Sequence, residues 1–471
     1  MAERVKGNDE KKVLDMIKSV QSLSGDIHPY KMDLESMKRS HGDESFQEIL
    51  MNVVKLLVDD PIRDSMVCNN QREEISNEKK PDYKLANPKI IDWSLETKLQ
   101  RVKLISKFLN RAEIDFVEIL KTTEQKIVFF QTIKKKHDEL CTLHNNYQSI
   151  ILFNETIREL VRDVHKVSEQ EIKHLGNVSS HVFYSSPLKG AGHFILMLSK
   201  KMYEKNLHEK LSEDTVLQLS GVIMEALAEV QTHRDELRSD NILQDQIQWT
   251  MDSNTVIDPI KRVLELMPEL IRNNESDALT ERMLELSRVI LHELEFAKDI
   301  EQARSNEDEL LEKFVFSRKK LIQMVEEFSV DSAMALATEY EDIENTTRLC
   351  LLIQDYEPLY RLLGNTKVEA RSLLIQESMQ WLVDDYLQQH RKRKMNEPFT
   401  YKLHLMDIYE GEYDAELEQF IKKYPKLRLI FAMKKGDFKE VVYQCKALEM
   451  KSEDKNLKKL FTDISEVNQE C

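Results

Sequence analysis

The segment LATEYEDIENTTRLC, residues 336–350, combines two apolar helical faces with a polar corner between them. Apolar residues three or four positions apart lie on one side of a helix, as they do on both halves of this segment. An aspartate at the corner suits the N-cap of the second helix, because its side chain accepts a backbone N–H bond. The pattern therefore predicts a helical hairpin. Its key residues are Leu336, Ala337, Tyr340, Asp342 and Cys350.

Two later segments, residues 405–420 and 430–445, repeat this plan. Each has an acidic and a bulky residue at the corner and an apolar residue seven positions after the bulky one. A small residue, Ala337 or Ala432, precedes the corner in the first and last copies, where two helices can approach closely. The corner pairs are Glu412/Tyr413 and Asp437/Phe438, and the apolar residues are Cys350, Phe420 and Cys445. We predict an all-α fold, an irregular α-solenoid of stacked helical hairpins.

Scarce glycine and proline support the all-α class. Only ten of each occur in 471 residues, too few for the many turns of a β-sandwich or a Rossmann sheet. Amphipathic stripes continue through most of the chain from residue 92 onward, with charged residues on the opposite faces. The stripes change phase between helices, which favours packed helices over one long coiled coil.

The charge and hydropathy of the chain argue against nucleic-acid binding and membrane insertion. The chain carries 68 basic and 84 acidic residues, a net charge of −16 that repels phosphate backbones and anionic lipids. We therefore expect no direct nucleic-acid binding. No apolar run approaches the roughly 18 residues that span a bilayer, so we expect no membrane insertion. The polar N-terminus and five unpaired, well-separated cysteines are typical of an intracellular protein with reduced thiols.

The sequence divides into three predicted parts. Residues 1–91 alternate short helices with breaks, and residues 69–89 form a polar, proline-containing linker. Residues 92–275 form a middle helical stack, and residues 276–471 form a C-terminal helical stack that binds partners.

Three sequence features could carry chemistry. His137, Cys141 and His144 lie at i, i+4 and i+7 on one predicted helix, as metal ligands could, but one helix rarely supplies three ligands to a tetrahedral ion. The segment KGAG, residues 189–192, resembles part of a phosphate loop, although no strand precedes it and a plain turn is the simpler interpretation. The basic run RKRK, residues 391–394, follows a helix end that cations stabilise, and could otherwise act as a nuclear import signal or a phosphate-binding patch. We predict no catalytic residue, metal site or cofactor.

An apolar strip precedes the first hairpin. An array of stacked helices leaves a surface at its end, and such a surface suits partner binding. The alternative is that the strip belongs to the core. Its residues, which we predict to bind a partner, are Leu321, Ile322, Val325 and Phe328.

The C-terminal half resembles the nucleoporin 133/155 family, specifically the C-terminal helical region of the tail member of the Y-shaped scaffold complex. The family pattern L-A-x-x-Y-x-D-F, followed after seven residues by Cys, matches the hairpin at residues 336–350, with Ile343 in place of the aromatic residue. Shorter matches occur in the same order upstream, at Arg318/Leu321/Ile322, Val182/Phe183/Tyr184 and Trp249/Thr250.

This resemblance implies a non-catalytic structural nucleoporin of the outer ring of the nuclear pore complex, at the nuclear envelope. It implies binding to other Y-complex nucleoporins, chiefly the stalk nucleoporin of the 107-kilodalton class, in support of pore assembly, protein transport and mRNA export. The family's N-terminal β-propeller has no counterpart in this sequence. The alternative function is an α-solenoid adaptor of a vesicle coat or tethering complex.

Overall fold

The computed structural model describes most of the chain, and every regular element in the described residues is a helix. The predicted all-α class is therefore confirmed. The predicted linker at residues 69–89 lies outside the described residues. The structure describes residues 9, 11–13, 16, 28–58, 95–111, 114, 117–142, 147–165, 183–184, 187–239, 249–304, 309–392, 405–409, 411, 413–451, 458–459 and 462–464.

The chain forms two compact units, Met1–Ser317 and Arg318–Cys471. The helices of the first unit are α2 (His28–His41), α3 (Asp43–Val58), α5 (Leu95–Arg111), α6 (Val117–Thr142), α7 (Tyr147–His165), α10 (Pro187–His208), α11 (Glu213–Ser239), η1 (Trp249–Met251), η2 (Ser253–Ile257), α12 (Asp258–Leu264), α13 (Met267–Asn274) and α14 (Asp277–Arg304). Helix α15 (Glu309–Glu326) contains the division between the units.

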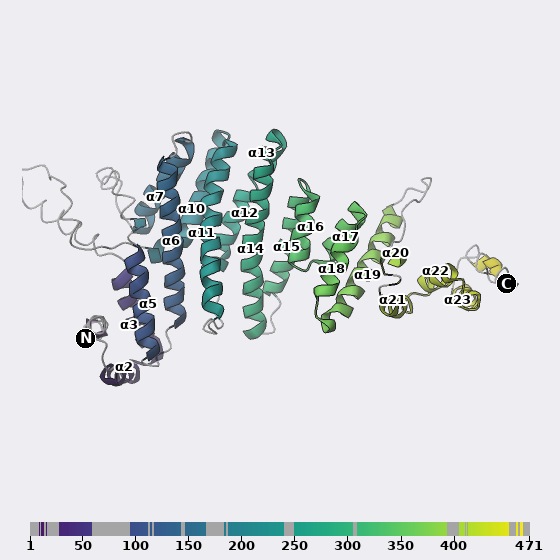
Figure 1. The fold of residues 1–471 in the computed structure, drawn as a ribbon, viewed down its shortest axis with the longest axis horizontal. Coiled ribbons are helices and arrows are strands. Elements are labelled where there is room, and N and C mark those ends of the chain that lie inside the picture. The colour runs from purple at the N-terminus through teal and green to yellow at the C-terminus, as the bar shows by residue number, and fades with distance from the viewer. Residues whose placement is uncertain are drawn as a thin grey trace, which may run out of the picture. The chain divides into compact units, whose positions relative to one another are not determined.

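The first unit has two rows of helices. Helices α5, α6, α11 and α14 lie side by side in that order, and α7, α10 and α12 pack together in a second row (Figure 1). Ion pairs supplement the apolar contacts between neighbours: Lys136 on α6 contacts Glu225 on α11, with Nζ and Oε2 2.6 Å apart. This pair is partly exposed, so it contributes less than the apolar packing around it.

Helix α14 shows why these sequences form packed helices. Its apolar residues recur after four, three, four, four and three positions, which is the period of one helical face. All of them are buried, and burying each large aliphatic side chain contributes about 1.5–3 kcal/mol relative to exposure. The buried residues are Leu279, Met283, Leu286, Ile290, Leu294 and Ala297.

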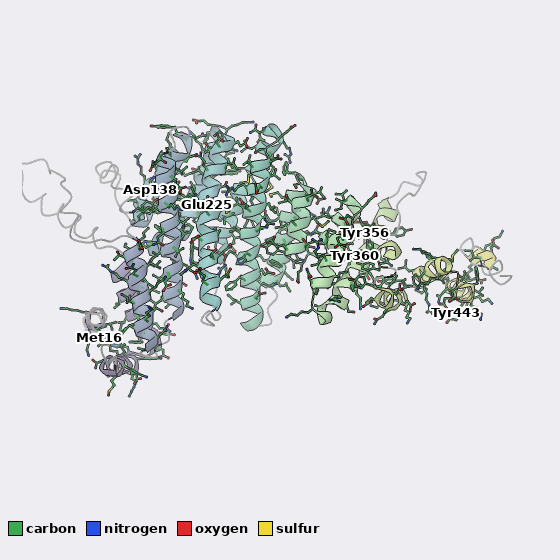
Figure 2. The ribbon with its side chains drawn as sticks, in the orientation of Figure 1. Met16, Asp138, Glu225, Tyr356, Tyr360 and Tyr443 are labelled. Carbon is green, nitrogen blue, oxygen red and sulfur yellow. The ribbon has the colours of Figure 1, made fainter. Side chains whose placement is uncertain are left out.

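The second unit is a succession of shorter helices, each of which packs mainly against helices one or two positions away in the chain. After the last part of α15, these are α16 (Val330–Glu339), α17 (Ile343–Ile353), α18 (Glu357–Asn365), α19 (Val368–Lys392), α20 (Leu405–Tyr409), α21 (Asp414–Ile421), α22 (Pro425–Lys435) and α23 (Phe438–Lys451). Hydroxyl groups also join them: Tyr360 on α18 donates to the carbonyl of Ile408 on α20 at 2.6 Å (Figure 2).

The division between the units differs from the predicted one at residues 275 and 276. That position falls inside the first unit, just before α14, and α14 packs against α11 of the same unit. The apolar face of α14 therefore belongs to the core that the earlier helices form. The predicted boundary at residues 91 and 92 lies outside the described residues, whereas α3 before it packs against α5 after it.

The first and last predicted hairpins have the same corner geometry. In the first corner, the N–H of Asp342 donates to the carbonyl of Ala337 at 2.8 Å, and in the last the N–H of Asp437 donates to that of Ala432 at 3.0 Å. Each aspartate then accepts a backbone N–H from three residues later, so the predicted caps are present. In the middle segment, between α20 and α21, the corner residue Glu412 lies outside the described residues.

One residue in each matched corner has a left-handed backbone. It is Glu341 in the first corner, with φ of 50°, and Gly436 in the last, with φ of 69°. The left-handed conformation costs roughly 1–2 kcal/mol for a residue with a Cβ atom, and glycine avoids this cost. The first corner therefore carries strain that the last does not.

We expect Glu341→Gly to stabilise the second unit by about 0.5–1 kcal/mol, because the relief of backbone strain exceeds the added entropy of the unfolded chain. The matched substitution Gly436→Ala should lower stability by about 1 kcal/mol, since a Cβ there meets open space and only the backbone conformation changes. Urea unfolding monitored by circular dichroism measures both. Equal effects of the same sign would contradict this account of the corners.

Candidate functional site

A buried ion pair joins α11 and α14 at the centre of the first unit. Arg234 lies on α11 and Glu293 on α14, and both side chains have 0 % exposure. Arg234 Nη2 donates to Glu293 Oε1 at 2.8 Å, and Nη1 donates to Oε2 at 2.9 Å. This two-point contact fixes the guanidinium and carboxylate planes relative to each other.

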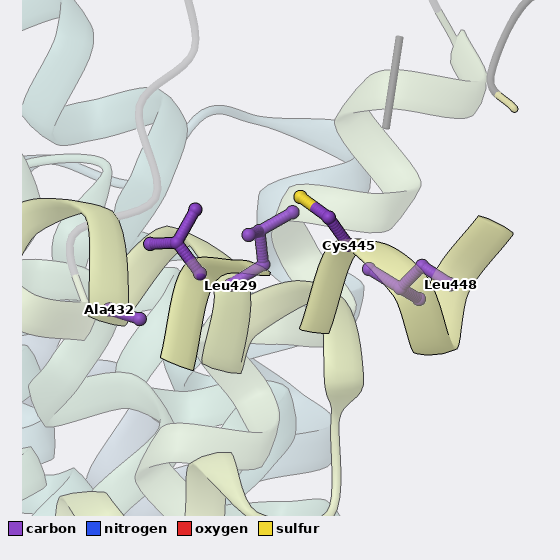
Figure 3. Packing of buried hydrophobic residues seen from close by; sticks show 5 residues of the cluster. Leu429, Ala432, Cys445 and Leu448 are labelled. Carbon is purple, nitrogen blue, oxygen red and sulfur yellow. The ribbon is translucent and has the colours of Figure 1, made fainter. Parts of the chain in front are cut away.

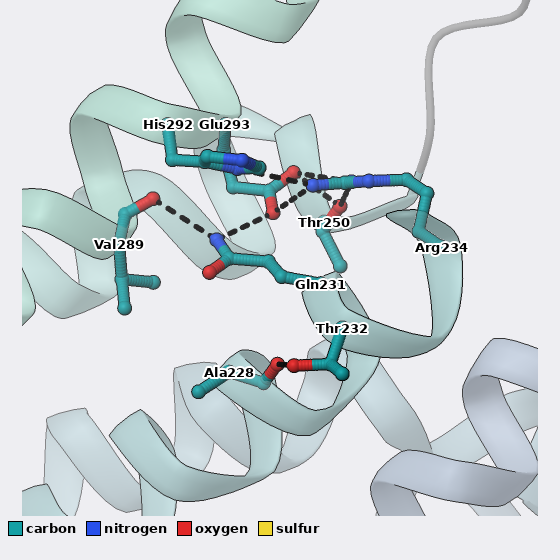
Figure 4. Close-up of polar contacts among 8 residues, drawn as sticks. All are labelled: Ala228, Gln231, Thr232, Arg234, Thr250, Val289, His292 and Glu293. Atoms are coloured by element: carbon teal, nitrogen blue, oxygen red, sulfur yellow. Dashed lines mark hydrogen bonds and ion pairs between the residues drawn. The ribbon is translucent and has the colours of Figure 1, made fainter. Parts of the chain in front are cut away.

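Neighbouring side chains add further hydrogen bonds to this pair (Figure 4). The hydroxyl of Thr250, in η1, donates to Glu293 Oε2 at 2.6 Å, and the amide of Gln231 donates to Oε1 at 2.9 Å. The Arg234 guanidinium also lies over the Phe296 ring, 4.6 Å from its centroid. Each carboxylate oxygen thus accepts one bond from Arg234 and one from a neutral donor.

The surroundings keep Glu293 ionised. Burial by itself raises the pKa of this carboxyl, but the charge and hydrogen bonds of Arg234, with those of Thr250 and Gln231, hold the pKa below its ordinary value. A general base needs an available oxygen within reach of a substrate proton, and both oxygens here are occupied and buried. The cluster is therefore suited to holding α11, η1 and α14 together.

His137 has a packing role in an aromatic cluster. Its ring stacks on Phe153 with centroids 4.6 Å apart, and its Nε2 lies 3.1 Å from Asn154 Oδ1. That oxygen only accepts, so Nε2 carries the hydrogen and Nδ1 accepts from the Tyr184 hydroxyl at 3.2 Å. Burial lowers the pKa of His137, so the ring stays neutral at pH 7.

Of the other two residues of the possible metal cluster, Cys141 is exposed and His144 lies outside the described residues. Within the described part of the chain, no group of three or more His, Cys, Asp or Glu residues could hold a metal ion.

The described cysteines have the character of protonated thiols. Burial raises the pKa of Cys350 to about 11 and also raises the pKa values of Cys445 and Cys141. A thiolate is the form that attacks substrates and binds metals. These three thiols are therefore poorly suited to nucleophilic catalysis, and Cys350 and Cys445 pack in the interior.

The KGAG segment is neither a phosphate loop nor a turn, because it lies in the first two turns of α10. A Cβ atom on Gly190 would lie 2.6 Å from Cζ of Phe130, and one on Gly192 would lie 2.9 Å from Oγ1 of Thr255. These glycines let α10 approach α6 and η2 closely. Sequence alone could not reveal this, because the contacting residues are far away in the chain.

The basic run at residues 391–394 is only partly described. Arg391 and Lys392 are the last two residues of α19, and the rest of the run lies outside the described residues. Helix α19 begins at Val368.

The predicted partner-binding strip is mostly buried. Leu321, Ile322 and Val325 have the packing role that the sequence left as the alternative, and Phe328 is half-buried. An apolar helical stripe has the same pattern whether it faces a core or a partner, which is why the sequence could not separate the two roles. The residues of the hairpin motif, Leu336, Ala337, Tyr340, Asp342 and Cys350, are also buried.

Large exposed apolar side chains gather instead on the last described helix pair. They are Ile430 and Met433 on α22 and Phe438, Tyr443 and Met450 on α23. The sequence analysis did not single them out; Tyr443 and Met450 lie opposite the buried face of α23, which was a readable signal.

Comparison with known proteins leaves the resemblance to nucleoporins as a prediction. No protein-family model matches this sequence, and no curated protein gives a significant match. Of the helices in the described ranges, none has both the length and the apolar character needed to cross a bilayer.

We expect Glu293→Leu to destabilise the first unit by about 3–5 kcal/mol, because it leaves the Arg234 charge buried without a partner. Replacing both residues, with Arg234→Met and Glu293→Leu, should restore much of that loss. Glu269→Gln at the exposed pair with Lys210 is the control and should have little effect. Urea unfolding measures all three, and a double variant less stable than Glu293→Leu would contradict the role of the pair.

The pair also predicts an acid dependence. Since the folded-state pKa of Glu293 is lowered, its contribution is fully present above the unfolded value of about 4.3 and is lost as pH falls through the folded value. The difference in stability between the wild type and Glu293→Gln should therefore shrink as the pH falls from 6 towards 3. A constant difference would contradict an ionised Glu293.

We expect Gly190→Ala to destabilise the first unit by up to about 2 kcal/mol. Alanine improves helix propensity by about 1 kcal/mol, but its methyl group overlaps the buried Phe130 ring, and overpacking costs about 1–3 kcal/mol. Gly364→Ala, in α18, meets open space and should not destabilise its unit. Thermal unfolding compares them, and a stabilising Gly190→Ala would contradict the close approach.

Proposed function

We propose that this chain is a non-catalytic scaffold that binds other proteins through the end of an irregular α-solenoid. One observation carries the proposal: the helices of the second unit pack mainly on their neighbours in the chain. Such an arrangement is nearly one-dimensional and leaves a terminal helix with one side uncovered. The exposed apolar side chains on α22 and α23 supply the surface that such a side offers to a partner.

The buried polar groups support a structural role. Arg234 (through both Nη atoms), Glu293 and His137 bind partners within the protein, and each contact joins two helices or anchors a ring. Charged side chains that are paired in this way favour one arrangement of the helices over others. This use of titratable groups fits a scaffold better than a catalyst.

The resemblance to the nucleoporin 133/155 family supports a specific setting for the scaffold. We propose that the chain belongs to the outer ring of the nuclear pore complex, at the nuclear envelope, and binds Y-complex nucleoporins, chiefly the stalk nucleoporin of the 107-kilodalton class. The order of the short motifs from Phe183 to Cys350 is what favours this setting.

Imaging and purification of the tagged full chain test this proposal together. We expect a nuclear-rim signal that overlaps an outer-ring marker, and stoichiometric co-purification of the stalk nucleoporin. A chain with Glu293→Leu should lose both in proportion to its unfolding, which controls for non-specific retention. Punctate cytoplasmic signal with vesicle-coat or tethering subunits in the purified material would overturn the nuclear-pore setting and favour the adaptor.

A further inference from the structure

Helix α23 has two opposite faces. Val441, Cys445 and Leu448 lie at i, i+4 and i+7 and pack against Leu429 and Ala432 of α22 (Figure 3). This face closes the small core of the helix pair, so the apolar side that would usually bind a partner or a membrane is already occupied.

The opposite face carries a stripe of alternating basic and large apolar residues, at i, i+4, i+7 and i+11. At 3.6 residues per turn these positions fall within about 60° of one another, so they form one line along the helix. Tyr443 is 63 % exposed and Met450 is 86 % exposed (Figure 2). The residues of this outward stripe are Lys439, Tyr443, Lys446 and Met450.

The positive charge of the outward stripe is not neutralised nearby. Lys439 and Lys446 are exposed and form no ion pair or hydrogen bond with any residue that the structure describes. Of the two carboxylates on α23, Glu440 accepts from Arg428 at 2.5 Å and from Gln444 at 2.8 Å, and Glu449 follows Lys446 by three positions. Asp437, in the turn, accepts the backbone N–H of Glu440 at 3.1 Å.

The helix pair is basic although the chain is acidic. Helices α22 and α23 together contain seven Lys or Arg residues and two Glu residues, in a chain of net charge −16. A protein of this net charge repels acidic partners over most of its surface, so a locally basic end determines where such a partner approaches.

We propose that the outward stripe of α23 is the docking surface for an acidic amphipathic helix of a partner protein. The alternation predicts the partner's pattern: apolar residues that cover Tyr443 and Met450, with Glu or Asp beside them for Lys439 and Lys446. The aromatic ring and the flexible thioether supply buried area, while the lysines set orientation and association rate. Helix-on-helix recognition of this kind uses anchors three or four residues apart.

A protein partner fits the outward stripe better than a lipid surface or a nucleic acid does. A membrane-binding helix inserts a broad apolar face, but here only two large apolar side chains lie on the stripe and the broad face is packed on α22. Nucleic-acid grooves combine several aromatic platforms with basic charge, and the stripe has one aromatic residue.

The proposal rests on the scaffold function, and its test uses a probe of defined chemistry. The probe is a synthetic fluorescent helix of three heptads, with Leu at the a and d positions and Glu at e and g; its comparison peptide has Lys in place of Glu. We expect the full chain to bind the Glu peptide at least tenfold more tightly than the Lys peptide by fluorescence anisotropy. Binding should weaken as salt rises from 50 to 300 mM.

Matched variants locate the binding. Lys439→Glu with Lys446→Glu, and separately Tyr443→Ser with Met450→Ser, should each weaken binding of the Glu peptide at least tenfold. Lys103→Glu with Lys107→Glu makes the same charge change on exposed lysines of α5 beside exposed Leu104, and should change binding less than twofold. Circular dichroism shows whether each variant keeps its helix content; all substituted side chains are exposed.

Three results would overturn the proposal: no binding of the Glu peptide, equal weakening by the α5 variant, or preferential binding to a competing probe. The competing probes are vesicles with 30 % phosphatidylserine and a 20-nucleotide single-stranded DNA. Preferential binding to either probe counts against the proposal when the stripe variants also lose that binding. These outcomes leave nuclear-rim localisation and co-purification unaffected, so failure of this inference and failure of the scaffold function are distinguishable.

Discussion

The constraint on which both units depend is that each helix must bury one apolar face against other helices of its own unit. Helix α14 meets it with an uninterrupted stripe of six buried residues, and α23 meets it with three residues against α22. Because a few buried residues provide the packing of each helix, its opposite face can carry charged side chains. Among the helices that the structure describes, α23 packs chiefly against α22, and its opposite face carries the exposed side chains that make it a candidate for binding.

Polar contacts determine the position along each helix at which its neighbour packs. Apolar packing alone tolerates a slip of one helix against the next, whereas the bidentate contact between Arg234 and Glu293 is satisfied in one arrangement. The corners act in the same way, because the carbonyl of Ala337 or Ala432 accepts the N–H of the aspartate that begins the next helix. Arg234, Glu293 and the two corner aspartates therefore act on the fold.

The all-α class and the hairpin corners were predictable because they depend on local features. Helical periodicity, scarce glycine, and an aspartate before a helix are all visible within a few residues, and the caps at Asp342 and Asp437 follow from them. The stacked-solenoid arrangement stays a prediction.

Features that depend on distant residues were not predictable. The role of Gly190 depends on Phe130, and the burial of Glu293 depends on Arg234, 59 positions earlier. The role of the strip at Leu321 to Phe328 was unpredictable for the same reason, because an apolar stripe has the same sequence pattern whether the core or a partner covers it. The outward stripe of α23 was readable from its spacing, but only the structure shows which face of the helix is covered.

Site-specific photo-cross-linking from α23 tests the central claim, that this chain is a scaffold with its binding surface at its last described helices. A photoreactive phenylalanine derivative replaces Tyr443, and in a second chain it replaces the exposed Leu104 of α5. The account predicts one discrete protein adduct from position 443, with an acidic helical segment at the cross-linked site, and none of equal yield from position 104. A chain that stays in its assembly but yields no protein adduct from position 443 would contradict it.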